Sequence, residues 1–89
     1  MVSLTEAKLY LYVDHDDDDE IITDIIKASE DLVKDVLRVD ELPEDDDNTI
    51  KVAVLYAIAY MYEHREEADL HTLTLNLRYY LFGKRKAAF

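Results

Sequence analysis

The densest group of reactive side chains in this sequence is the acidic run over residues 14–20, which holds six carboxylates and one histidine. The first three ligand positions of a calcium-binding EF-hand loop are matched by Asp14, Asp16 and Asp18. That loop also requires a turn glycine and a final bidentate glutamate, where this sequence has Asp19 and Ile25. The match fails at its two most demanding positions. A solvated helix-capping segment is the better interpretation, with weak divalent-ion binding as the open alternative.

Other side chains that could support catalysis are few and scattered. The chain has no cysteine, which excludes a disulfide framework, a cysteine-based zinc site and a thiol nucleophile. The three histidines, His15, His64 and His71, show no metal-ligand spacing. No serine or threonine lies in the sequence context of an activated nucleophile. We therefore expect no enzyme activity, no cofactor and no bound metal.

Aromatic and basic side chains in the second half indicate contact with other proteins instead. The sequence has seven tyrosines and no tryptophan. Tyrosine is favoured as an interface anchor, although tyrosines equally form the rim of a core. The last seven residues contain three bases and a terminal aromatic, and they are either a frayed end or a segment that docks on an acidic surface. The candidate partner-binding residues are Tyr56, Tyr60, Tyr79, Tyr80, Lys84, Arg85, Lys86 and Phe89.

The elements that must position these residues are expected to be helices. The chain has 89 residues, enough for one domain, and contains one glycine and one proline. Turn-rich β-sandwiches and barrels need those residues at their corners, so the composition favours an all-α fold. We expect a single helical domain over residues 1–82, followed by a basic tail over residues 83–89. The predicted small bundle has about four helices, at approximately residues 4–13, 17–39, 48–66 and 73–82.

The first two predicted helices carry clear sequence signals. Ser3 and Glu6 have the spacing of a capping box, in which each side chain accepts a backbone N–H of the other residue. In the second helix a small side chain, Ser29, lies in the middle of an apolar stripe and would let a neighbouring helix approach closely. At helical periodicity that stripe consists of Ile22, Ile25, Ile26, Ser29, Leu32, Val33 and Val36.

The last two predicted helices lack a simple amphipathic pattern. From Ile50 to Tyr62 the only charged residue is Lys51, and a helix that is apolar all round must be covered on more than one face. So small a domain has few elements to cover it, which leaves part of this surface for another copy or a partner. Residues 70–82 fit both a strand-like alternation and a helical spacing. A lone strand would lack a partner here, so a helix is favoured.

The net charge of −11 is concentrated in the first half of the chain. Residues 1–47 carry 17 acidic and 4 basic side chains, whereas residues 48–89 carry 4 and 6. Such a surface should repel nucleic acid and anionic lipid. The longest apolar stretch, residues 52–61, is too short to span a bilayer, and the first residues lack the pattern of a signal peptide. We expect synthesis in the cytoplasm and no membrane association.

The order of these features resembles one known family. The acidic run, the long amphipathic helix and the acidic proline loop lie between three recognisable segments. These are Leu4-Thr5-Glu6-Ala7-Lys8-Leu9-Tyr10-Leu11, Ile50-Lys51-Val52-Ala53-Val54-Leu55 and Tyr60-Met61-Tyr62-Glu63-His64-Arg65-Glu66. Over roughly residues 3–82 the chain resembles the head–tail connector family of tailed phages and prophages, whose members are also described as head-completion or DNA-packaging adaptor proteins.

The resemblance implies a structural adaptor that forms a homo-oligomeric ring of about a dozen copies on the portal protein of a capsid. The ring would extend the DNA channel without binding DNA specifically, and would dock a downstream head-completion or tail protein. The implied location is the head–tail junction of the virion, after assembly in the host cytoplasm. Charge alone suggests an alternative, an acidic DNA-mimic or inhibitor module that binds a basic nucleic-acid-binding protein.

Overall fold

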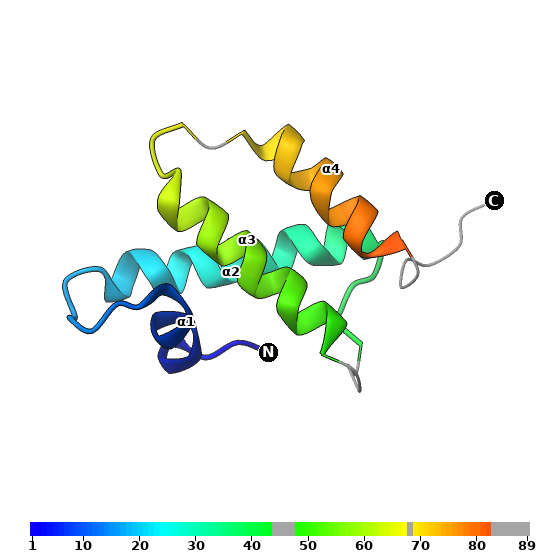
Figure 1. Cartoon of the computed structure of the whole chain (residues 1–89). Coiled ribbons are helices and arrows are strands. Elements are labelled where there is room, and N and C mark those ends of the chain that lie inside the picture. The colour runs from blue at the N-terminus through cyan, green and yellow to red at the C-terminus, as the bar shows by residue number, and fades with distance from the viewer. Residues whose placement is uncertain (44–47, 68, 83–89) are drawn as a thin grey trace.

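The computed structural model describes residues 1–43, 48–67 and 69–82, and this part of the chain contains four helices. They are α1 (Leu4–Leu11), α2 (Asp19–Leu37), α3 (Thr49–Glu63) and α4 (Leu70–Tyr80). Helices α2 and α3 form the central pair, and α1 and α4 each pack against both of them near opposite ends (Figure 1). The all-α prediction is confirmed. The molecule is elongated, with principal extents of 45 × 29 × 18 Å.

The start of α1 follows from its capping box, as predicted. The Ser3 hydroxyl accepts a hydrogen bond from the Glu6 N–H at 3.1 Å, and the Glu6 carboxylate accepts one from the Ser3 N–H at 3.3 Å. These two bonds satisfy N–H groups that have no partner inside the helix. The helix is shorter than the predicted 4–13, because the backbone leaves helical geometry at Tyr12.

Helices α1 and α2 end in the same way, with a non-glycine residue in the left-handed conformation. Tyr12 has a φ of 59° and Arg38 a φ of 61°. In each case the next residue, Val13 or Val39, donates its N–H to a carbonyl five residues back, at 2.9 and 3.1 Å. This is the Schellman arrangement, in which glycine is the usual left-handed residue. This chain has only one glycine, and tyrosine and arginine occupy the left-handed position at the ends of α1 and α2. Helix α2 therefore ends at Leu37, two residues earlier than predicted.

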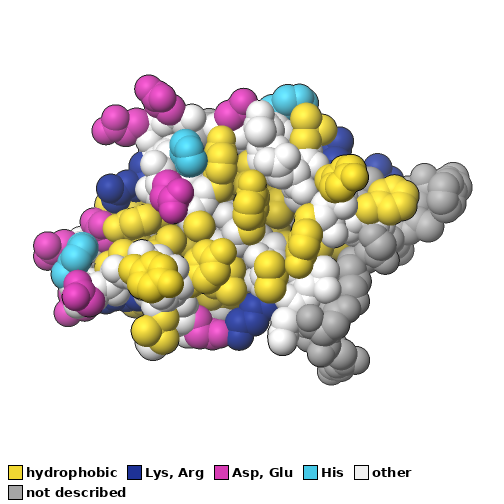
Figure 2. All heavy atoms as spheres, in the orientation of Figure 1, with side chains coloured by type: hydrophobic (Ala, Val, Ile, Leu, Met, Phe, Trp, Pro, Cys, Tyr) yellow, Lys and Arg dark blue, Asp and Glu magenta, His cyan; other side chains and the backbone are white. Residues whose placement is uncertain are grey.

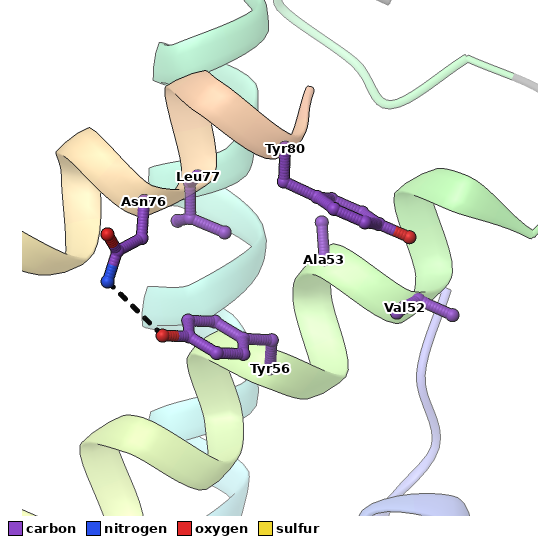
Figure 3. A pocket seen from close by; sticks show the side chains of 6 residues that line it. All are labelled: Val52, Ala53, Tyr56, Asn76, Leu77 and Tyr80. Carbon is purple, nitrogen blue, oxygen red and sulfur yellow. Dashed lines mark hydrogen bonds between the residues drawn. The ribbon is translucent and has the colours of Figure 1, made fainter. Parts of the chain in front are cut away.

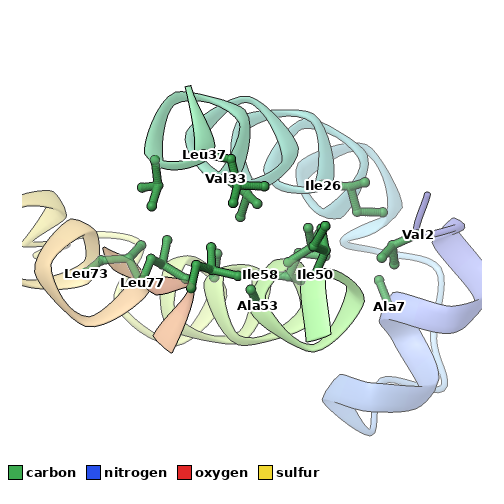
Figure 4. Packing of buried hydrophobic residues seen from close by; sticks show 14 of the residues in the cluster. Val2, Ala7, Ile26, Val33, Leu37, Ile50, Ala53, Ile58, Leu73 and Leu77 are labelled. Atoms are coloured by element: carbon green, nitrogen blue, oxygen red, sulfur yellow. The ribbon is translucent and has the colours of Figure 1, made fainter. Parts of the chain in front are cut away.

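The apolar stripe of α2 packs along α3, as Figure 4 shows for part of the core. The small side chain predicted to permit close approach does so: Ser29 is fully buried, and its hydroxyl lies 3.6 Å from the Met61 sulfur on α3. The fully buried hydrophobic side chains with the largest volumes are Ile22, Val33, Leu37, Ile50, Val54, Ile58, Leu73, Leu77 and Leu81. This core draws on α2, α3 and α4, while α1 adds Ala7.

Helix α4 begins earlier than predicted, at Leu70 instead of residue 73. The reason is a cap: the Asp69 carboxylate accepts hydrogen bonds from the Thr72 N–H at 3.1 Å and from the Thr72 hydroxyl at 2.7 Å. The alternation of leucines that resembled a strand is resolved as a helix, with Leu73 and Leu77 buried one turn apart.

Candidate protein-docking surface

A groove of about 200 Å³ opens between α3 and α4 on the surface of the bundle. Its α3 wall is made by Val52, Ala53 and Tyr56, and its α4 wall by Asn76, Leu77 and Tyr80. Figure 3 shows the Tyr56 and Tyr80 rings over the space between the two helices, with Ala53 beneath. One hydrogen bond ties the walls together, from the Asn76 side-chain amide to the Tyr56 hydroxyl at 3.3 Å. We call these six residues the α3–α4 groove.

The groove follows from helical spacing on two helices that share a core. On α3, Val52 and Tyr56 are one turn apart and remain 46% and 42% exposed, while the neighbouring Ala53 is fully buried. On α4, burial of Leu73 and Leu77 leaves Asn76 and Tyr80 one turn apart at the edge of the contact. Alanine at position 53 leaves room that a larger residue would fill. The result is a small apolar depression with two half-exposed tyrosines.

The aromatic surface continues from the groove past the end of α4. Tyr79 is 90% exposed and Phe82 is 78% exposed, and together they line a second, shallower depression. Figure 2 shows apolar side chains spread across α3 and α4 and out to this end of the molecule. Large exposed aromatic side chains gathered in one region are typical of protein contact sites. The predicted Tyr56, Tyr79 and Tyr80 are thus brought to one region of the surface.

The fourth predicted tyrosine, Tyr60, is placed differently. Its hydroxyl accepts a hydrogen bond from the Asp69 N–H at 3.1 Å and donates to the Asp69 carbonyl at 3.4 Å. Its ring stacks on His64, with ring centroids 4.3 Å apart. Tyr60 therefore joins the end of α3 to the start of α4, and its partner-binding role stays a prediction. The predicted Lys84, Arg85, Lys86 and Phe89 lie outside the described residues.

At the other end of the molecule, the acidic run is tied into the fold by basic and phenolic groups. The Lys8 ammonium forms ion pairs with Asp16 at 2.8 Å and Asp19 at 2.7 Å. Hydrogen bonding to these carboxylates raises the pKa of Lys8, and the Lys8 hydrogen bond lowers the pKa of Asp16. Asp18 holds the N-cap position of α2 without a capping bond from its side chain. Its carboxylate instead accepts a 2.6 Å hydrogen bond from the Tyr62 hydroxyl.

That contact between Asp18 and Tyr62 is reinforced by Arg65. The Arg65 guanidinium lies 3.6 Å from the Asp18 carboxylate and 4.8 Å from the centre of the Tyr62 ring. The hydrogen bond to Asp18 and burial raise the pKa of Tyr62. The carboxylates nearest the bundle thus hold α1, α2 and the end of α3 together. Within the described residues, no group of three or more histidine, aspartate or glutamate side chains is arranged to hold a metal ion.

Sequence reasoning missed two parts of this surface. Val52 and Asn76 line the groove beside the predicted tyrosines, and the one-turn spacing of each from its tyrosine was the available signal. The second part is an exposed apolar pair at the C-terminal end of α1, Leu9 and the cap residue Tyr12, which are 73% and 95% exposed. Leu9 lies in the last turn of α1 and Tyr12 ends the helix, and nothing in the sequence marks these two side chains as exposed.

Comparison with known proteins gives one match, to a family model. The model of the phage gp6-like head-tail connector proteins matches residues 1–80. No curated protein and no solved structure matches the chain significantly. Among the helices of the described segments, none is both long and apolar enough to cross a membrane. The family match covers all four helices and every residue of the α3–α4 groove. The chain belongs to the phage gp6-like head-tail connector family.

Proposed function

We propose that this phage structural adaptor assembles as a ring of about a dozen copies on the portal protein. The ring extends the DNA channel and presents a docking site to the next head-completion or tail protein. In this proposal the protein folds in the host cytoplasm and ends at the head–tail junction of the virion. The observation that carries the proposal is the family match over residues 1–80.

The shape and surface of the protein support assembly through unlike contacts. A closed ring needs a heterologous interface, in which one patch of each copy meets a different patch of the next. The α3–α4 groove and the aromatic side chains beyond it form an apolar region on one part of the molecule. The acidic loop between α1 and α2 lies at the opposite end (Figures 1 and 2). The two regions differ in chemistry and in position, as such an interface requires.

The charge of the protein supports passage of DNA without attachment. A protein that grips duplex DNA does so mainly by neutralising phosphates with lysine and arginine. This chain has 21 acidic against 10 basic residues. Several carboxylates of the α1–α2 loop also project into solvent: the side chains of Asp16 and Asp17 are 89% and 94% exposed. A ring built from such subunits would offer few phosphate-binding sites to sliding DNA.

The direct test mixes the purified chain with its cognate portal protein. Negative-stain images and co-purification should show an added ring on the portal and a fixed ratio of the two proteins. Failure to co-purify with the portal, together with no ring at high protein concentration, would contradict the proposal.

A truncation separates the adaptor from the DNA-mimic alternative. Removing residues 83–89 deletes Lys84, Arg85, Lys86 and Phe89 but none of the described helices. An adaptor that uses this segment as a contact should assemble more weakly without it. An acidic inhibitor should keep its salt-sensitive complex with a basic partner, because its acidic residues are untouched.

A further inference from the structure

Tyr12 has the most exposed large hydrophobic side chain in the described part of the fold. Tyr12 is 95% exposed, so it contributes almost no packing to its own bundle. It also occupies the left-handed position that ends α1, with a φ of 59°, where a side chain with a Cβ atom carries a steric cost and glycine or asparagine is the usual choice. Since the ring gives its own fold almost no contact, its large aromatic surface is available to another molecule.

We propose that Tyr12 of one copy inserts into the α3–α4 groove of the next copy in the ring. This inference rests on the proposed function and names the contact that closes the ring. Tyr12 and Leu9, one turn earlier on the outer side of α1, form the projecting part, which we call the α1 knob. The receiving part is the groove of Val52, Ala53, Tyr56, Asn76, Leu77 and Tyr80.

The size and chemistry of the two parts agree. The groove has a volume of about 200 Å³. An apolar cavity of about 150 Å³ accepts one benzene ring, so the groove accommodates one aromatic side chain and little more. Its walls present tyrosine rings, against which another ring can pack edge to face. Polar atoms at its edge, the Asn76 amide and the Tyr56 hydroxyl, could meet the hydroxyl of an inserted tyrosine.

Charge around the two parts is complementary. The α1 knob is followed directly by the acidic run, in which Asp14 and Asp17 point into solvent. Arg78 is exposed in the last turn of α4 and follows the groove residue Leu77 in the sequence. Placing the knob of one copy in the groove of the next brings the acidic run towards the helix that carries Arg78. Contacts that bring two acidic runs together would be repelled, so charge favours the pairing of unlike regions.

The arrangement in space excludes the same contact within one molecule. The α1–α2 loop and the end of α4 lie at opposite ends of the bundle (Figure 1). The knob also belongs to a helix held against α2 and α3, partly through the buried Ala7. The knob therefore meets a groove only on another copy. Each copy has one knob and one groove, which produces a chain of copies that closes when the rotation between neighbours allows it.

Cysteine crosslinking tests this contact, since the natural chain has no cysteine to interfere. The full chain carrying both Leu9→Cys and Asn76→Cys, which keeps the Tyr12 ring, is assembled with the portal, oxidised, and run on a non-reducing gel. We expect a ladder of covalent oligomers from the double variant and none from either single variant. The matched control is Leu9→Cys with Leu70→Cys, because Leu70 is 52% exposed on the same helix as Asn76 but outside the groove. This control should give at least tenfold less covalent oligomer on the gel.

A second comparison keeps the inference independent of crosslinking geometry. Tyr12→Gly removes the ring and suits the left-handed backbone, so the monomer should keep its melting temperature while ring assembly weakens at least tenfold. Tyr12→Phe keeps the ring and loses only the hydroxyl, so it should assemble far better than Tyr12→Gly. The inference is wrong if wild-type rings form while Tyr12→Gly assembles normally, or if the double-cysteine variant forms rings without a ladder. If the wild type never engages the portal, the proposed function fails first, and this contact fails with it.

Discussion

The two ends of α3 both carry tyrosines, but those at the C-terminal end are bonded within the bundle and the one nearer the N-terminal end is partly exposed. Near the C-terminal end, the Tyr62 hydroxyl donates a 2.6 Å hydrogen bond to Asp18, and Tyr60 is bonded to the backbone of Asp69. Near the N-terminal end, Val52 and Tyr56 remain about half exposed beside the groove, and the Tyr56 hydroxyl receives a longer bond of 3.3 Å. The comparison teaches that the aromatic side chains of one helix divide into two kinds. Some close the bundle, and others stay exposed at the surface that we propose docks a partner.

The largest effect on folding is expected from the buried side of α3. Ile58 is fully buried, whereas Val52 is 46% exposed on the same helix. Ile58→Ala should lower the free energy of unfolding by about 2–5 kcal/mol, because it leaves a cavity in a thin core. Val52→Ala should change it by less than about 1 kcal/mol. Urea denaturation followed by circular dichroism measures both, and similar losses would contradict the division of α3 into two faces.

The next largest effect is expected where Tyr62 closes the bundle. Tyr62→Phe removes the bond to Asp18 and leaves a partly buried carboxylate with Arg65 as its remaining contact. Hydrogen bonds to charged groups contribute about 1.5–3 kcal/mol, so a loss near the lower value is expected. Tyr56→Phe is the matched variant at the groove and should lose less than about 0.5 kcal/mol. If Tyr56→Phe lowered the free energy of unfolding as much as Tyr62→Phe does, the two tyrosines would not differ in their contribution to the fold.

A smaller, pH-dependent effect is expected at the ion pairs of Lys8. The Lys8 hydrogen bond lowers the pKa of Asp16 below its ordinary value of 3.8, so this stabilisation is present above that pH and is lost as the pH falls through the lowered pKa. Lys8 has a pKa raised above 10.5, so its contribution is lost at high pH as the pH rises through the raised value. Thermal melts of wild type and Lys8→Met should therefore differ at neutral pH and converge in acid. A constant difference down to pH 2 would contradict this account.

The smallest effect on folding is expected from the groove itself. Tyr80 is 49% exposed, and its hydroxyl takes no part in the polar contacts that hold the described bundle together. Tyr80→Ser should cost at most about 1 kcal/mol, measured as a shift of the urea midpoint. A larger loss would place Tyr80 with Tyr62, among the residues that close the bundle, and would weaken the assignment of the groove to a partner.

The fold was largely predictable because its signals are local. The capping box of α1 and the apolar stripe of α2 both depend on spacings within one helix, and both are present as predicted. The start of α4 was missed because its cap is an Asp69–Thr72 pair inside a segment whose leucines alternate. The early ends of α1 and α2 depend on a residue in the left-handed conformation. Tyrosine and arginine rarely adopt this conformation, so the sequence did not predict it.

The surface was predictable only in part, because its residues meet across the fold. Tyr56 and Tyr80 are 24 positions apart, and only the packing of α4 on α3 brings them to one groove. The internal role of Tyr60 depends on the path of the chain between α3 and α4, which no periodicity encodes. Asn76 was overlooked because a polar residue on an exposed helix face is ordinary until its neighbours are known.

The most direct test of the central claim, that α3 and α4 present a docking surface used in assembly, joins folding and assembly in one variant. Wild type and Tyr80→Ser are each titrated onto the cognate portal, and bound protein is measured by analytical ultracentrifugation, with urea unfolding run on the same samples. The account predicts that Tyr80→Ser keeps its fold but binds the portal as a ring at least tenfold more weakly. A folded Tyr80→Ser that assembles on the portal as well as the wild type would contradict it.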